Sequence, residues 1–298
     1  MRNSSLIPFA PLLLPIVAGF AASPEPLVQR VDADSQAAAA LMSAHEHPDR
    51  SVRLIAHAAS MAPDRADLAW LHIQFCQRDA SCDPEPLERR LRSLDGKNGA
   101  GWLGALARAG ERGDEEAKSA ALAAMGRAER VDIYWTTLIA RLSRPVADAR
   151  SVSLFDAEVF VIGALAAVAI PAYQTVAGAC DSERLVRDDV AAVCRGVADA
   201  FLQGDTAITE MTGVAIATRA WPEHSPKWVE ATKARRVRDY RVQFADPAAA
   251  WHRAHAGDYL ALCEQHRREQ DVEQAVLVAI GRNPDPPPVR SEATQAGR

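Results

Sequence analysis

The stretch NGAGWLGALARAGERGDEEAKSAALAAM, residues 98–125, decides the fold because it holds two helix patterns with a turn between them. Asn98 is a favourable helix cap, and it precedes Trp102 and a run of small and apolar residues. The pair Gly113-Asp114 then supplies a turn and a second cap, followed by two glutamates where a helix dipole favours negative charge. Four apolar residues share one face of the second helix: Ala117, Ala121, Leu122 and Met125. The stretch therefore predicts a helical hairpin.

A similar pattern recurs on both sides of this hairpin. Trp70, Trp102 and Trp135 are separated by 32 and 33 residues, and each lies near the start of an apolar-periodic segment. An Asp or Asn stands three or four residues ahead of each tryptophan, where a cap is expected. Asp83 opens a further helix between these segments, and residues 51–61 indicate another. This period predicts a repeated helical hairpin.

Residues 51–142 resemble the tetratricopeptide class of helical repeats, whose hairpins are about 34 residues long. The resemblance is carried by the early tryptophan, the small-residue helix, the turn and two alanines: Trp102, Gly113-Asp114, Ala117 and Ala121. Three family positions differ, namely Ala105-Leu106 after the tryptophan, Ala109 at the aromatic position, and no closing proline near Arg130. The resemblance implies stacked hairpins with a concave groove for a peptide or protein. The alternative is an Ala-rich bundle whose tryptophans are evenly spaced by chance.

Composition agrees with a helical protein. The 298 residues are 48% hydrophobic and 24% charged, which is typical of globular proteins and excludes disordered and collagen-like classes. Aromatic residues make up only 6%, and Val and Ile rarely alternate with polar residues. We therefore expect an all-α fold of stacked helical hairpins, with no substantial β-sheet. The net charge of −5 argues against nucleic-acid binding, which needs a surplus of positive charge.

The amino terminus is typical of a secretory signal. Residues 6–22 carry no charge, follow Arg2, and end in a run of small residues. We expect a signal peptide over residues 1–21, cleaved after Ala21, and therefore a periplasmic or secreted protein. The uncharged residues 159–179 are interpreted as a buried core helix, because Pro171 and several polar residues lower their hydrophobicity. No transmembrane span is expected after signal removal.

The rest of the chain divides into three predicted regions. Residues 22–150 form the helical-repeat region, residues 151–282 a C-terminal helical region packed on it, and residues 283–298 a proline-rich disordered tail. Seven helices are expected in the C-terminal region: 155–170, 190–203, 207–220, 227–244, 247–255, 259–268 and 271–280.

All five cysteines follow the signal and so meet an environment in which disulfides persist. We predict the pairs Cys76–Cys82 and Cys180–Cys194. Fourteen residues of unbroken helix would separate the second pair by about 21 Å, whereas bridged Cα atoms lie about 4.4–6.8 Å apart. The chain must therefore fold back between these two cysteines. Cys263 is left over, either free or metal-bound.

Catalytic motifs give little signal. Residues 99–104 match the dinucleotide pattern GxGxxG, but no strand precedes them as that motif requires. No HExxH, GxSxG, Walker or CxxC motif is present, so no cofactor is predicted.

Histidines form two candidate metal clusters. The first contains His45, His47, His57 and His72. The second, His252, His255, Cys263 and His266, offers three nitrogens and a thiolate, a plausible zinc ligand set if the chain reverses near residue 257. The alternatives are solvent-facing histidines and a buried cysteine that packs as a small apolar residue.

The segment 227–244 has a basic face. On a helix, Lys227, Arg235, Arg238 and Arg241 lie opposite an apolar stripe made of Val229, Val237, Tyr240 and Phe244. On an acidic protein this face suits an acidic partner or an anionic polymer of the cell envelope. The alternative is a solvated face whose arginines cover neighbouring apolar surface.

Two functions remain open from the sequence. The first is a non-enzymatic interaction module that holds a peptide or protein partner in the cell envelope, because stacked hairpins create long grooves. The second is a metal-dependent envelope enzyme that uses a His/Cys cluster.

Overall fold

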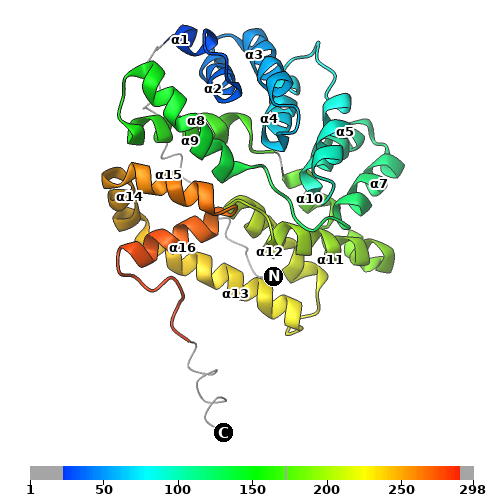
Figure 1. Cartoon of the computed structure of the whole chain (residues 1–298). Coiled ribbons are helices and arrows are strands. Elements are labelled where there is room, and N and C mark those ends of the chain that lie inside the picture. The colour runs from blue at the N-terminus through cyan, green and yellow to red at the C-terminus, as the bar shows by residue number, and fades with distance from the viewer. Residues whose placement is uncertain (1–22, 172, 289–298) are drawn as a thin grey trace.

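The computed structural model describes residues 23–171 and 173–288 and confirms the all-α fold (Figure 1). Within these ranges the only β-type pairing is one isolated bridge between Asn98 and Arg130. The proposed signal peptide lies outside the described residues. Of the predicted tail, residues 283–288 are described, and the Arg241 side chain donates a hydrogen bond to the carbonyl oxygen of Pro284 at 3.1 Å.

The first half of the chain is a run of helices in which neighbours along the chain pack together. Its elements are α1 (Glu25–Val28), α2 (Ala33–Ser43), α3 (Pro48–Met61), α4 (Ala66–Cys76), α5 (Glu85–Leu94), the 3₁₀ helix η2 (Gly99–Trp102), α6 (Leu103–Arg112) and α7 (Glu115–Met125). The predicted hairpin of residues 98–125 is confirmed. Gly113 ends α6 in the left-handed conformation, and the Asp114 carboxylate caps α7 by accepting from the Ala117 N–H at 2.9 Å.

The second half continues with α8 (Trp135–Arg150), α9 (Leu154–Val168), α10 (Gln174–Ala179), η3 (Arg184–Val186), α11 (Asp188–Leu202), α12 (Ala207–Ala220), α13 (Pro226–Arg241), η4 (Val242–Phe244), α14 (Ala245–Ala254), α15 (Ala256–Gln265) and α16 (Glu269–Ala279). All seven helices expected in the C-terminal region are present, with ends within three residues of prediction.

Helix α8 packs between the N-terminal helices and the C-terminal helices. It packs against α2 from the first half and against α9 and α15 from the second (Figure 1). Helix α11 likewise packs on α7. Helices from the second half of the chain thus pack against helices from the first half. The helices therefore do not form a linear stack in which each one contacts only its neighbours along the chain.

The three tryptophans occupy different places in their units. Trp70 is the fifth residue of α4 and is buried, Trp102 ends η2 with the Arg92 guanidinium 4.2 Å from its ring centroid, and Trp135 begins α8. Because η2 runs directly into α6, Trp70 and Trp102 each lie about one turn into a helical segment, whereas Trp135 is the first residue of α8.

The predicted core helix over residues 159–179 is interrupted. Helix α9 ends at Val168, Pro171 lies in the break, and α10 begins at Gln174. Proline removes a backbone donor and disfavours a helical residue before it, which explains the interruption. Among the described residues no single helix is long and apolar enough to cross a membrane; α8 and α9 pass that test only as a pair, bent by 120°.

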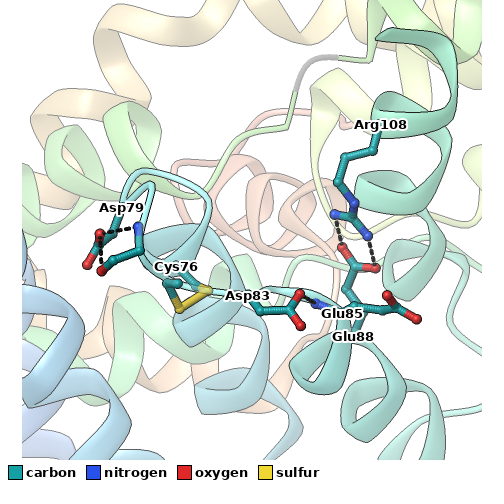
Figure 2. Close-up of a disulfide and its surroundings, with 8 residues drawn as sticks. Cys76, Asp79, Asp83, Glu85, Glu88 and Arg108 are labelled. Carbon is teal, nitrogen blue, oxygen red and sulfur yellow. Dashed lines mark hydrogen bonds and ion pairs between the residues drawn. A yellow bond between two sulfur atoms is a disulfide. The ribbon is translucent and has the colours of Figure 1, made fainter. Parts of the chain in front are cut away.

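Both predicted disulfides are confirmed. The Cα atoms of Cys76 and Cys82 lie 5.2 Å apart, and those of Cys180 and Cys194 lie 5.7 Å apart because the chain between them turns back through η3, which packs against α11. Figure 2 shows the first bridge closing a loop in which the Asp79 carboxylate accepts from the Ser81 N–H and hydroxyl. Cys263 is the one free cysteine in the part of the chain that the structure describes, and it is buried.

Close packing of α7 on α11 depends on two glycines. A Cβ atom added to Gly196 would lie 2.2 Å from the carbonyl oxygen of Gly126. We expect Gly196→Ala to lower the free energy of unfolding by about 2 kcal/mol, because the backbones must separate to admit the methyl group. Gly163→Ala is the matched control, since its Cβ would meet nothing within 4 Å and alanine favours helix. Urea unfolding measures both, and equal midpoints would contradict the close approach.

Candidate functional site

The basic residues of α13 are largely paired within the fold. The Lys227 ammonium lies 3.0 Å from Asp199 and 3.3 Å from Glu230, and both partners raise the pKa of Lys227. Arg238 forms an ion pair with Glu273 of α16. Arg235 is exposed, and its one ion pair among the described residues is with Asp239 of the same helix, at 3.9 Å.

Arg241 also faces the protein. Its side chain donates to the carbonyl oxygens of Gln270, at 2.9 Å, and Pro284, at 3.1 Å. Together Arg238 and Arg241 hold α16 and the following segment on α13. The predicted apolar stripe is less regular, because Val229 is 47% exposed and Ala231 is the buried residue of this helix. The predicted basic face is therefore mainly a contact between α13 and its neighbours.

The four residues of the second predicted metal cluster have separate surroundings. His252 pairs through its Nε2 atom with the buried carboxylate of Glu158 and stacks on the Tyr259 ring, with centroids 3.8 Å apart. The Nδ1 atom of His255 lies 3.0 Å from the carbonyl oxygen of Trp251.

The other two members do not approach them as ligands. Burial raises the pKa of the Cys263 thiol to about 12, which opposes the thiolate that a metal would need. His266 follows the last residue of α15. In residues 23–171 and 173–288 no group of three or more His, Cys, Asp or Glu side chains could hold a metal ion. This finding applies equally to the first cluster of His45, His47, His57 and His72.

A larger candidate site lies where the chain enters α2. Residues 28–31 and one face of α3 line an open cavity of about 670 Å³, which we call the α1–α3 groove. Its lining combines four apolar residues with four basic ones and two glutamines: Val28, Val31, Leu54, Met61, Arg30, Arg50, Arg53, His57, Gln29 and Gln36.

One wall of the groove is held by a buried glutamine. The Gln36 amide lies within hydrogen-bond distance of three carbonyl oxygens of the preceding segment: Leu27 at 3.4 Å, Val28 at 3.0 Å and Arg30 at 2.7 Å. Leu27 is buried beneath this segment, and the Asp32 carboxylate caps α2 by accepting from the Ser35 N–H at 2.8 Å. These contacts fix residues 28–31 in a turn that leaves Val31 91% exposed.

The opposite wall follows from the helical period. Arg50, Arg53, His57 and Met61 are spaced by three or four residues, so they share one face of α3. Leu54 lies beside them and is nearly buried, whereas Met61 is 37% exposed. The groove therefore places exposed apolar side chains beside cationic ones.

The charge of the groove is opposite to that of the whole chain. No lining residue is acidic, whereas the protein carries a net charge of −5. The Arg30 guanidinium lies 3.3 Å from Asp148, and that of Arg50 lies 2.7 Å from Glu25, both partners being outside the lining. Arg53 is exposed and has no ion pair within the described residues. The groove is thus suited to a ligand that carries both negative charge and apolar surface.

Sequence patterns identified the α3 helix but not this site. His57 belonged to a predicted metal cluster, whereas no role was predicted from the sequence for Arg50, Arg53 and Met61. The only available signal was an aliphatic residue, Met61, in register with basic residues. This pattern indicates a site only once the structure shows that residues 28–31 lie opposite that face of α3.

Neither protein-family models, nor curated proteins, nor solved structures give a significant match to this chain.

Proposed function

We propose that this protein is a non-enzymatic interaction module that binds a peptide or protein segment in the α1–α3 groove. The supporting observation is that Val31 and Met61, two exposed apolar side chains, line the same cavity of about 670 Å³ as four basic residues. Exposed apolar surface rimmed by polar groups is typical of interaction sites. The groove offers binding groups, and no assembled nucleophile or metal cluster accompanies it among the described residues.

The proposed location is outside the cytoplasm, in the periplasm or the medium. Two disulfides support an oxidising environment, in which such bonds persist. The amino-terminal sequence pattern supports export independently. The partner is accordingly proposed to be a component of the cell envelope.

Site-specific photo-cross-linking in intact cells tests the proposed function. A benzophenone amino acid in place of Val31 is expected to form an adduct with one defined peptide segment, identified by mass spectrometry. The same replacement at Val186 is the control, because that valine is 81% exposed but lies in η3, which is not part of the groove lining.

A second variant ties the adduct to the groove. Met61→Glu alters an exposed lining residue, so the fold is expected to persist while the Val31 adduct is lost. If positions 31 and 186 cross-link to the same molecules, the groove is not the binding site. The same conclusion follows if Met61→Glu leaves the adduct at position 31 unchanged.

A further inference from the structure

We propose that the α1–α3 groove recognises an extended peptide segment of about six residues, with an acidic side chain near its middle and aliphatic side chains toward Met61. This inference rests on the proposed function and adds the chemical class of the ligand. It is carried by the arrangement of charge and apolar surface along α3.

A second cavity extends the groove along the helix. Its volume is about 370 Å³, and it shares Arg50 and Arg53 with the first cavity. The two cavities together follow α3 from His47 to Met61, which at a helical rise of about 1.5 Å per residue is about 21 Å. An extended chain covers that distance with about six residues.

The two ends of this track differ in chemistry. The first cavity has aliphatic side chains and no acid, whereas the rim of the second contains Glu46 and Asp49. An acidic ligand group at the second end would be repelled by these carboxylates. Aliphatic ligand side chains therefore fit the Met61 end, and a neutral or basic residue fits the other end.

The position of the acidic group follows from the shared arginines. Arg50 and Arg53 stand between the two cavities, one turn apart on α3. Arg50 already has Glu25 at 2.7 Å, whereas Arg53 is exposed with no ion pair within the described residues. A guanidinium binds a carboxylate through two parallel hydrogen bonds, so Arg53 is the main expected contact.

Fluorescence anisotropy with synthetic peptides tests this inference on the full-length mature protein. The probes are amidated hexapeptides with a rhodamine label at one end, in the two orders Leu-Val-Ser-Glu-Ser-Asn and Asn-Ser-Glu-Ser-Val-Leu. Matched peptides carry Gln or Lys in place of Glu. At least one order is expected to bind at least about tenfold more tightly with Glu than with Gln, the scale of a charge-assisted contact.

Charge reversal then identifies the contact. Arg53→Glu is expected to weaken the Glu peptide at least about tenfold and to bind the Lys peptide better than the unaltered protein does. Arg235→Glu is the matched control, since Arg235 is an exposed arginine on α13 outside both cavities, and affinity should stay within about twofold.

Two results with the peptides alone would overturn the acidic-peptide inference: no binding of the Glu peptides, or equal affinity for the Glu and Gln peptides. Equal losses of affinity from Arg53→Glu and Arg235→Glu would also overturn it. So would polyphosphate, which has no apolar side chains, if it displaced the labelled Glu peptide as well as the unlabelled Glu peptide does. If the Glu and Gln peptides bind with equal affinity and both lose binding in the Met61→Glu variant, the acidic-peptide inference fails but the proposed function of the groove does not. Failure of the proposed function is recognised separately, by the cross-linking at position 31.

Discussion

Replacing Asp205 with alanine is expected to lower the free energy of unfolding by about 4 kcal/mol, because two buried backbone N–H groups would each lose their acceptor at about 1–3 kcal/mol. The Asp205 carboxylate is fully buried and accepts from the N–H of Ile133 at 3.0 Å and of Trp135 at 2.8 Å. It therefore holds the start of α8, the helix that joins the two halves of the molecule. Urea unfolding followed by circular dichroism measures the loss.

The environment of Asp205 also sets a pH dependence. Burial and the nearby charge of Asp132 raise the pKa of Asp205 to about 7. An unfolded aspartate has a pKa of about 3.9, so between these values the folded state binds the proton more tightly. The contribution to stability is therefore full below about pH 4 and is lost as the pH rises through about 7.

Asp205→Asn separates the two effects. Asparagine keeps one acceptor oxygen but does not titrate, so part of the decrease in stability between pH 5 and pH 8 should disappear. We expect the change in that decrease to be at least about 1 kcal/mol, which corresponds to less than one pKa unit. A pH profile identical to that of the unaltered protein, or a loss below about 1 kcal/mol for Asp205→Ala, would contradict the role assigned to this carboxylate.

Arg108→Ala is expected to lower the free energy of unfolding by about 3 kcal/mol, because it leaves the carboxylate of Glu88 buried without its main partner. Figure 2 shows the two side chains joining α5 to α6, with both N···O distances at 2.7 Å. The Glu88 side chain is only 2% exposed. Gly104 leaves room for it, since a Cβ there would lie 2.2 Å from the Glu88 Oε1 atom. Arg92, at 3.9 Å from the same carboxylate, keeps the expected loss at the lower end for a buried pair.

The matched control for Arg108 is an arginine of α5, the helix that carries Glu88. Arg89→Ala removes an exposed pair with Glu85, whose side chains are 58% and 64% exposed, and should cost about 0.3–0.5 kcal/mol. The double variant Glu88→Gln with Arg108→Ala should recover part of the loss, because an uncharged amide is less costly to bury. Equal losses in the free energy of unfolding from Arg108→Ala and Arg89→Ala would show that burial does not increase the contribution of the Glu88–Arg108 pair to stability.

Local features of the fold were predictable from sequence. The Gly113-Asp114 turn, the seven C-terminal helices and both disulfides all depend on residues within about 15 positions of one another. The helix end before Pro171 was predicted to within two residues by the range 155–170, but the uncharged stretch 159–179 was interpreted as one helix. The apolar composition favoured one helix, whereas the backbone geometry of proline ended it.

Site residues were harder to predict because their partners are distant in the chain. The basic residues of α13 looked available for a ligand, yet Glu273 lies 35 positions from Arg238 and belongs to α16. His252 looked like a metal ligand, yet its partner Glu158 is 94 positions away in α9. Composition and period contain no information on which side chains neutralise each other after the helices pack.

The sequence by itself determined the helical class, most helix ends and the cysteine pairing, since capping, periodicity and loop closure act between near neighbours. Only the tertiary structure decided which basic residues stay exposed and where apolar side chains gather beside them. Arg53 and Met61 share a helix face by period alone, but the wall opposite them exists because Gln36 holds residues 28–31 in place. Packing between helices creates that groove, and packing depends on contacts that no local pattern specifies.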